Sequence, residues 1–249
     1  MAQNKHHPTI FEFSFQSKLK KNISKLMAAS TTAAKSSSME AYKIYRYIPN
    51  MIGYVRVFLS LLSFFIYGSC PATVIVIYST SFVLDGLDGI AARRYNQCSR
   101  FGAVLDMVTD RFSTAALVTI LCNFYPAYTS YFVLLNILDF VSHWFRMYVS
   151  LVVGTASHKD VDWNRSYLLA LYYTNKTFMA ILCVGNEMFY VFLYALHFYD
   201  ISGVWLYIAL ALLVPTWAGK QLMNFIQMYC SANELVEFEY EKDAHHKKN

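Results

Sequence analysis

The stretch SFVLDGLDGIAARRYNQCSRFGAVLDMVTDR, residues 81–111, places four aspartates inside two otherwise apolar segments. Asp85 and Asp88 lie near the end of the first segment, and Asp106 and Asp110 lie near the start of the second. An aspartate at the centre of a membrane-inserted helix costs about 2.5–3.5 kcal/mol, and less near the helix end. Four such residues therefore predict that a polar cavity or a cation, rather than lipid, surrounds the carboxylates.

The spacing of the aspartates predicts how they are arranged. Each pair is three or four residues apart, so its two side chains share one face of a helix. Because the connection between the segments is short, we expect antiparallel neighbouring helices with converging carboxylates. Oxygen ligands without nearby His or Cys favour Mg²⁺ or Mn²⁺ over Zn²⁺. Small residues lie one turn from the acids and leave room for a phosphate group, for which Arg93 supplies a cation; they are Gly89, Ala92 and Gly102.

Two other interpretations of the four acids remain open. The first is a structural network in which Arg93, Arg94 and Arg111 neutralise the aspartates by ion pairing. The second is a cation transporter, since transporters also carry carboxylates within their spans. Transporters often show repeated halves, and no internal repeat is visible in this sequence. The pattern therefore favours a metal-dependent enzyme that acts on a lipid.

The composition of the 249 residues is that of a membrane protein. Apolar residues make up 56% and charged residues 15%, against about 25% charged residues in a typical soluble domain. The net charge of +5 comes from residues 1–38, which hold six lysines and one glutamate. A nucleic-acid-binding protein needs its basic excess on a folded face, so no nucleic-acid partner is expected. The five cysteines form no CxxC pair and predict no disulfide framework.

The hydropathy pattern predicts an all-α polytopic membrane protein with six transmembrane helices. Residues 1–48 are expected to be a basic disordered tail with a short amphipathic segment before the membrane, residues 49–230 a six-helix catalytic domain, and residues 231–249 a charged cytosolic tail. A longer loop is expected over residues 155–177. The six spans are expected at about 50–67, 71–92, 102–124, 128–153, 178–198 and 204–229.

The positions of Lys and Arg predict the orientation of these spans. The connections after the first, third and fifth spans contain neither residue. The connections after the second and fourth spans contain Arg93, Arg94, Arg100, Lys159, Arg165 and Lys176. By the positive-inside rule, both termini and the aspartate-rich site should face the cytosol.

The spacing D-x2-D-G-x2-A-R-x8-G-x3-D-x3-D resembles the signature of the CDP-alcohol phosphatidyltransferases. Its fixed positions are Asp85, Asp88, Gly89, Ala92, Arg93, Gly102, Asp106 and Asp110. Further stretches are similar to the branch of that family whose acceptor is myo-inositol: PNMIGYVRV (49–57), LDFVSHW (138–144) and CVGNEMFY (183–190).

The resemblance implies transfer of the phosphatidyl group of CDP-diacylglycerol to myo-inositol, giving phosphatidylinositol and CMP. It further implies an enzyme of the endoplasmic reticulum membrane that works as a homodimer. An acceptor such as glycerol phosphate or serine remains the alternative within the family.

The resemblance also assigns roles to individual residues. Asp85, Asp88 and Asp106 would hold a two-metal centre of Mg²⁺ or Mn²⁺. Asp110 would accept the proton of the attacking hydroxyl and join the metal ligands. Three residues would contact the nucleotide or pyrophosphate of CDP-diacylglycerol: Gly89, Arg93 and Ser99.

Other polar residues inside the spans allow two interpretations each. Asp139, His143 and Arg146 share a helix face and are expected either to contribute to the inositol pocket or to tie their helix to Arg111 or to backbone carbonyls.

Asn50 and Arg56 are expected either to reach the nucleotide or to serve as a helix cap and a packing ion pair. Glu187 is expected to form hydrogen bonds inside the bundle, and Lys220 either to do the same or to extend toward the membrane surface.

Overall fold

The computed structural model describes residues 41–153 and 167–246, and these residues form helices without any strand. Five of the six predicted spans match helices whose ends shift by at most two residues. Residues 1–40 of the predicted basic tail (1–48) lie outside the described residues, as do residues 155–166 of the predicted loop (155–177). The elements are α2 (Ile48–Phe65), α3 (Pro71–Arg94), α4 (Arg100–Phe124), the 3-10 turn η1 (Pro126–Tyr128), α5 (Thr129–Val153), α6 (Tyr167–Thr174), α7 (Lys176–Phe198) and α8 (Val204–His246).

Local sequence signals explain where several helices begin. Pro71 occupies the first turn of α3, where its missing N–H is not needed. Ser99 caps α4, since its side chain accepts a hydrogen bond from the Gly102 N–H at 3.0 Å. Between these helices the chain reverses direction within a few residues, and Asn96 adopts a φ of 53° there, a conformation that Asn tolerates better than most residues.

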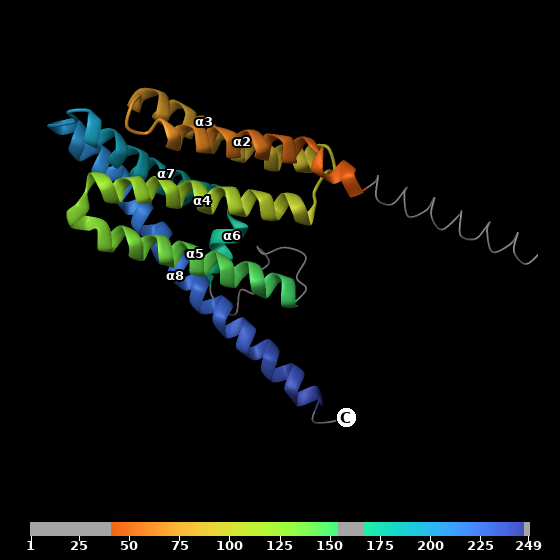
Figure 1. Ribbon diagram of the computed structural model, residues 1–249. Coiled ribbons are helices and arrows are strands. Elements are labelled where there is room, and N and C mark those ends of the chain that lie inside the picture. Colours follow the sequence, from red (N-terminus) through yellow and green to blue (C-terminus); the bar gives the residue numbers. More distant parts are fainter. Residues whose placement is uncertain (1–40, 154–166, 247–249) are drawn as a thin grey trace, which may run out of the picture.

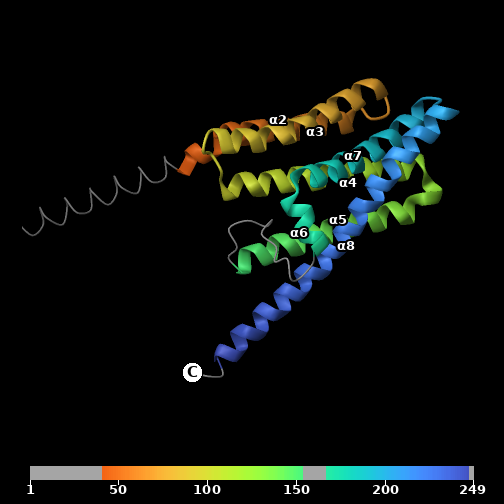
Figure 2. The same ribbon diagram turned by 180° about the vertical axis from the view of Figure 1, so that it is seen from behind.

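The helices pack in two groups that α4 and α7 join (Figures 1 and 2). Helix α2 packs against both α3 and α4, and α8 packs against both α5 and α7. The expected convergence of the α3 and α4 carboxylates is confirmed, because Asp85, Asp88 and Asp106 offer oxygen atoms within 4.8 Å of one another. The backbones of the two helices are held mainly through α2, which packs against both and places a side chain among the aspartates.

The surface and interior of the bundle have the polarity expected in lipid. Large apolar side chains such as Phe58, Trp144 and Trp205 are exposed, whereas the interior contains buried Asn, Ser, Thr, Arg and Glu side chains. Within residues 41–153 and 167–246, four helices are long and apolar enough to cross a membrane: α2, α3, α7 and α8 up to Asp243. The length and hydropathy of these helices show that the protein is an integral membrane protein.

Two parts of the fold differ from the expectation. The short helix α6 lies within the predicted loop of residues 155–177. Helix α8 continues without interruption through His246, with Pro215 inside it, although a separate tail was expected after residue 230. Figure 1 shows this helix extending beyond the other helices toward the C-terminus. Charge rather than hydropathy marked the expected end, and a charged sequence can remain helical in water.

Gly185 of α7 lies tightly against Thr216 of α8. A Cβ atom on Gly185 would lie only 2.1 Å from Thr216 Oγ1. A larger residue would therefore push the two helices apart at this point. The next two residues of α7 are Asn186 and Glu187, which are buried.

Candidate active site

The four predicted aspartates converge on the guanidinium group of Arg56, which α2 contributes. Arg56 Nη2 lies 2.7 Å from Asp85 Oδ1 and 2.5 Å from Asp110 Oδ1. Arg56 Nη1 lies 2.7 Å from Asp88 Oδ2 and 2.9 Å from Asp106 Oδ1. Arg56 is 2% exposed, whereas the Asp106 side chain is 48% exposed, so a buried guanidinium shares its one positive charge among four carboxylates that partly face solvent.

Three of these carboxylates form a group with the geometry of a metal site. Asp85, Asp88 and Asp106 each offer an oxygen atom within 4.8 Å of the others. The donors are hard oxygen atoms, which suit a divalent cation of the Mg²⁺ class. The negative charge in excess over Arg56 would also be offset by such a cation. The cluster therefore fits a divalent metal, and Asp110 lies beside this group rather than in it.

One cavity lies beside Asp88 and Asp106, and we call it the Asp106 cavity. It has a volume of about 150 Å³. Its walls include Gly89 and Ser99 together with Asn50, Gln97 and Gly102. Gly102 leaves the space open, because a Cβ there would lie 2.7 Å from Asn50 Oδ1 and 3.1 Å from Ser99 Oγ.

The residues expected to contact a nucleotide or pyrophosphate all lie around this cavity or next to it. Gly89 and Ser99 line it. Arg93 is exposed near the end of α3, and its guanidinium lies 3.5 Å from the position that a Gly89 Cβ would take. Ser99 also caps α4 through its hydroxyl, so this side chain has a structural function as well.

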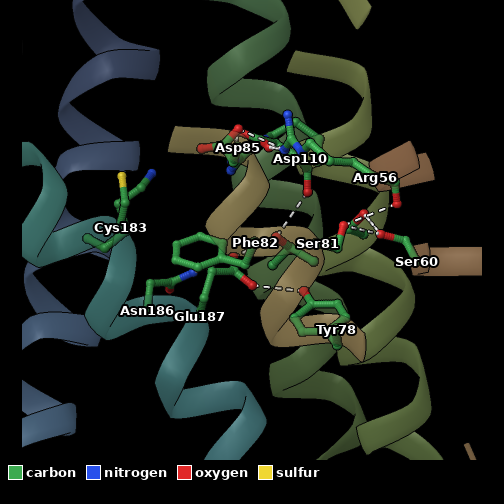
Figure 3. A pocket seen from close by; sticks show the side chains of 14 residues that line it. Arg56, Ser60, Tyr78, Ser81, Phe82, Asp85, Asp110, Cys183, Asn186 and Glu187 are labelled. Carbon is green, nitrogen blue, oxygen red and sulfur yellow. Dashed lines mark hydrogen bonds and ion pairs between the residues drawn. The ribbon is translucent and has the colours of Figure 1, made fainter. Parts of the chain in front are cut away.

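A second cavity lies on the other side of the cluster, beside Asp85 and Asp110, and we call it the Asp110 cavity (Figure 3). Its volume is about 90 Å³. Helices α3 and α4 contribute Tyr78 and Thr114 to its wall, and α7 contributes Asn186 and Glu187. Each cavity is thus lined by one aspartate of α3 and one aspartate of α4.

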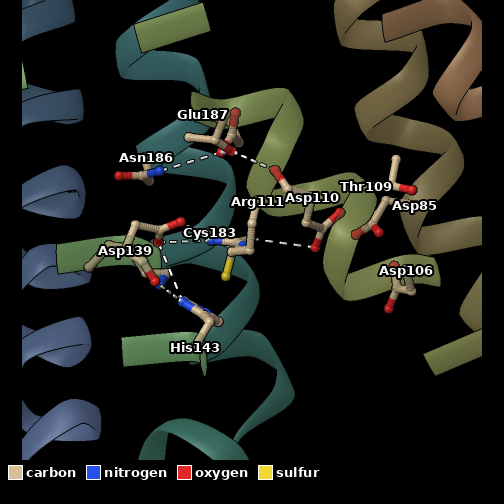
Figure 4. Close-up of polar contacts among 12 residues, drawn as sticks. Asp85, Asp106, Thr109, Asp110, Arg111, Asp139, His143, Cys183, Asn186 and Glu187 are labelled. Carbon is tan, nitrogen blue, oxygen red and sulfur yellow. Dashed lines mark hydrogen bonds and ion pairs between the residues drawn. The ribbon is translucent and has the colours of Figure 1, made fainter. Parts of the chain in front are cut away.

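Asp139 lies behind this cavity and binds the arginine that follows Asp110 (Figure 4). Arg111 Nη1 donates to both Asp139 oxygens at 2.9 Å, and its Nη2 lies 3.4 Å from Asp110 Oδ2. Asp139 also accepts from Asn224 Nδ2 at 3.0 Å, and His143 Nδ1 lies 2.8 Å from the Asp139 carbonyl oxygen.

Asp139 therefore ties α5 to Arg111 of α4 and to α8, as one of the two sequence interpretations expected. Arg146 lies farther along α5 and pairs with Glu234 of α8 at 3.1 Å. Neither His143 nor Arg146 lines the two cavities described above.

Arg56 is the residue whose role was least defined by the sequence. A buried arginine in the first apolar segment is a signal in itself, but its four partners lie on two helices far along the chain. The ion-pair alternative named Arg93, Arg94 and Arg111, and only Arg111 pairs with an aspartate of the cluster within the described residues. Gln97 was not singled out either; it accepts from the Ile48 N–H at 2.8 Å.

Glu187 and Lys220 both form hydrogen bonds inside the bundle. Glu187 accepts from Tyr78 Oη at 2.8 Å and from Thr114 Oγ1 at 2.6 Å. Lys220 is buried and donates to Asn224 Oδ1.

A family of membrane transferases shares this chain's sequence pattern. The family model described as CDP-alcohol phosphatidyltransferase matches residues 46–217, a range that contains Arg56, both aspartate pairs and, apart from Lys220, the residues that line both cavities. The chain belongs to the CDP-alcohol phosphatidyltransferase family.

Curated relatives narrow the comparison to one activity. A Candida albicans protein named CDP-diacylglycerol–inositol 3-phosphatidyltransferase is 44% identical over 80% of this chain and 84% of its own length. Proteins of the same name from Saccharomyces cerevisiae and Homo sapiens are 43% and 39% identical, over 85% and 78% of this chain and 94% and 92% of theirs. No solved structure matches the chain significantly.

Proposed function

We propose that this protein transfers the phosphatidyl group of CDP-diacylglycerol to myo-inositol, producing phosphatidylinositol and CMP. The observation that carries the proposal is the convergence of Asp85, Asp88, Asp106 and Asp110 between two cavities. The names of relatives at 39–44% identity support the same reaction. A phospholipid-synthesising transferase also explains why the charged site lies within an apolar bundle, since one substrate carries acyl chains.

Asp85, Asp88 and Asp106 are proposed to hold Mg²⁺ or Mn²⁺ in a two-metal centre. When bound, the metals would neutralise charge on the pyrophosphate and its leaving group. Gly89 and Ser99 are proposed to lie against the nucleotide in the Asp106 cavity, and Arg93 to pair with a phosphate oxygen.

Asp110 is proposed to act as the general base. It lies one turn beyond Asp106, and Arg56 Nη2 and Arg111 Nη2 hold its two oxygen atoms. These contacts fix the carboxylate beside the other three and leave it facing the Asp110 cavity. An alcohol is a weak nucleophile at neutral pH, so a positioned carboxylate that accepts its proton speeds the attack. Asp110 is also proposed to contribute to metal binding.

The orientation in the membrane is proposed as six spans with both termini and the active site at the cytosolic face. Helices α4 and α5 each have 25 residues, which at 1.5 Å per residue gives about 37 Å, enough to cross the apolar part of a bilayer. Their polar side chains lower their hydropathy but are turned into the bundle. Residues 49–230 would form the catalytic domain, and placement in the endoplasmic reticulum as a homodimer follows from the resemblance.

The part of the site that selects inositol is also a proposal. Asp139, His143 and Arg146 were expected near this pocket. Asp139 contacts Arg111, which lines the Asp110 cavity, so Asp139 and His143 would act through Arg111. Arg146 would act through its contact with α8.

The test of the proposed function is CMP release by the purified full-length protein in detergent. CDP-diacylglycerol would be supplied with Mg²⁺ or Mn²⁺ and, in turn, with myo-inositol, glycerol 3-phosphate or serine. We expect CMP release and a phosphatidylinositol product only with inositol. Release with glycerol 3-phosphate or serine instead would assign the other acceptor, and no release with any alcohol would contradict the proposal.

A further inference from the structure

The two cavities lie on opposite sides of the carboxylate cluster. Asp88 and Asp106 line the Asp106 cavity, whereas Asp85 and Asp110 line the Asp110 cavity. In phosphoryl transfer the attacking and leaving oxygens lie roughly in line on opposite sides of the phosphorus. If the nucleotide leaves through the Asp106 cavity, the incoming alcohol belongs in the Asp110 cavity.

The charges around the Asp110 cavity balance one another. Its lining contains three acids, Asp85, Asp110 and Glu187, and three bases: Arg56, Arg111 and Lys220. Among these lining residues the charges cancel, and Arg56 also pairs with Asp88 and Asp106 outside the lining, so the side chains supply no surplus of positive charge for an anionic ligand. A phosphorylated alcohol would bring about two negative charges, which a positive site would bind better.

Hydroxyl groups supply much of the remaining lining. They come from Ser60, Tyr78, Ser81, Ser113 and Thr114. Hydroxyls both donate and accept hydrogen bonds, as the hydroxyls of a polyol do. The volume of about 90 Å³ is several times the 10–15 Å³ that one water molecule requires, so the cavity has room for a small polyol.

Glu187 forms the wall of the cavity that faces away from Asp110. Its Oε2 accepts from Tyr78 Oη and its Oε1 from Thr114 Oγ1, so two helices hold the carboxylate in place. Glu187 Oε1 also accepts a longer hydrogen bond from Asn186 Nδ2 at 3.4 Å. A carboxylate offers about four lone-pair sites, so about one remains for a hydroxyl group of a ligand.

We propose that Glu187 determines which alcohol the Asp110 cavity accepts, by taking a hydrogen bond from a hydroxyl that does not react. Tyr78 is a positioning residue for Glu187. The inference rests on the proposed function and adds a residue that sets its specificity.

Two cysteines allow a test on the unmodified protein, because Cys98 lines the Asp106 cavity and Cys183 lines the Asp110 cavity. Purified protein would be treated with a small thiol-methylating reagent, and the labelling rate of each cysteine measured by mass spectrometry. We expect saturating myo-inositol, with CDP present, to slow labelling of Cys183 at least threefold. CDP alone should slow labelling of Cys98 only, and exposed Cys70 reports non-specific effects.

Several outcomes would overturn the assignment. Cys183 labelled at the same rate with and without inositol would place the acceptor elsewhere, and so would a Cys183 no more reactive than the buried Cys230. Protection by glycerol 3-phosphate as strong as that by inositol would contradict the selection of the alcohol by Glu187.

A pair of tyrosine variants provides a matched kinetic test. Tyr78→Phe removes the hydroxyl that holds Glu187, and Tyr190→Phe removes a buried hydroxyl that accepts from Trp217 Nε1 at 3.2 Å outside both cavities. We expect Tyr78→Phe to raise the KM for inositol three- to tenfold, with the Kd for CDP-diacylglycerol unchanged within twofold. Tyr190→Phe should leave both constants unchanged.

Glu187→Gln should raise the KM for inositol at least tenfold, because the amide turns a donor toward Tyr78 or Thr114. CDP-diacylglycerol binding by this variant shows that it is folded. An unchanged KM, or an equal loss of affinity for both substrates, would contradict the role of Glu187. Failure of the wild-type protein to release CMP with inositol would instead refute the proposed function.

Discussion

Arg56 forms ion pairs with an unusually large number of carboxylates for a single side chain. It is buried, and four carboxylates from two helices lie within 2.9 Å of its Nη atoms. Removing one partner of a buried ion pair costs about 3–5 kcal/mol, because the remaining charge is left without compensation. Here the removal would leave four charges of the same sign close together.

Arg56→Gln, which keeps much of the length but no charge, should therefore lower the free energy of unfolding by about 3–5 kcal/mol. Added Mg²⁺ should restore part of the loss, since a divalent cation would occupy the same set of carboxylates. Thermal denaturation in detergent, with and without Mg²⁺, measures both effects. The matched control is Arg94→Gln, at an exposed arginine, where we expect a change within about 0.5 kcal/mol. Equal stability of the two variants would remove the central role of Arg56.

Asp110→Asn separates proton transfer from binding. The amide keeps the shape of the side chain but cannot accept a proton, so turnover should fall at least about 10²-fold. Binding of CDP-diacylglycerol should weaken less than in Asp106→Ala, because Asp85, Asp88 and Asp106 remain. Single-turnover kinetics and calorimetry measure the two quantities, with Asp200→Asn in the exposed α7–α8 connection as the control. Activity within tenfold of wild type would exclude the base role, and binding lost as fully as in Asp106→Ala would make Asp110 chiefly a metal ligand.

At the scale of single helices, the sequence predicted where each helix begins and ends better than it predicted which helices pack together. The ends of α2, α3, α4, α5 and α7 follow from apolar length and from breaks at Pro, Gly and polar residues, which are local signals. Helix α6 was missed because eight residues are too few for a periodic pattern. The end of α8 was missed because its last turns are charged yet helical.

The packing of α2 against both α3 and α4 could not be predicted, since helix neighbours depend on packing rather than on order along the chain. The aspartates were found because each pair lies on one helix face, a short-range property. Their joint partner Arg56 and the wall formed by Glu187 depend on contacts between residues far apart in the sequence, which no spacing rule reveals.

Gly185→Ala tests the tight contact between α7 and α8. The new methyl group would lie 2.1 Å from Thr216 Oγ1 and 2.3 Å from Thr216 Cβ, so one helix must move. Overpacking of this kind costs about 1–3 kcal/mol, and we expect a lower midpoint of thermal unfolding. Gly86→Ala is the control on α3, because a Cβ there meets nothing within 4 Å; alanine should leave stability equal or slightly higher. A Gly185→Ala protein as stable as wild type would show that the helices can separate freely.

At the scale of the whole molecule, the proposed topology places the two ends of α3 on opposite sides of the membrane. Cys70 precedes this helix and Cys98 follows it, and both are exposed. In sealed vesicles with the cytosolic face outward, an impermeant thiol reagent should label Cys98 and leave Cys70 unlabelled until detergent is added. Labelling of Cys70 alone would invert the topology, and labelling of both in intact vesicles would mean that α3 does not span the membrane.

The order of the charges along the chain has a consequence for how the protein is made. The ribosome delivers α2 before α3 and α4, so Arg56 is already present when the four acids arrive. Each newly inserted aspartate then finds a cation supplied by the polypeptide itself, which lowers the cost of bringing the acid into lipid. We therefore expect insertion of the nascent chain to be independent of the metal supply of the cell, with the metal acquired after the bundle has assembled.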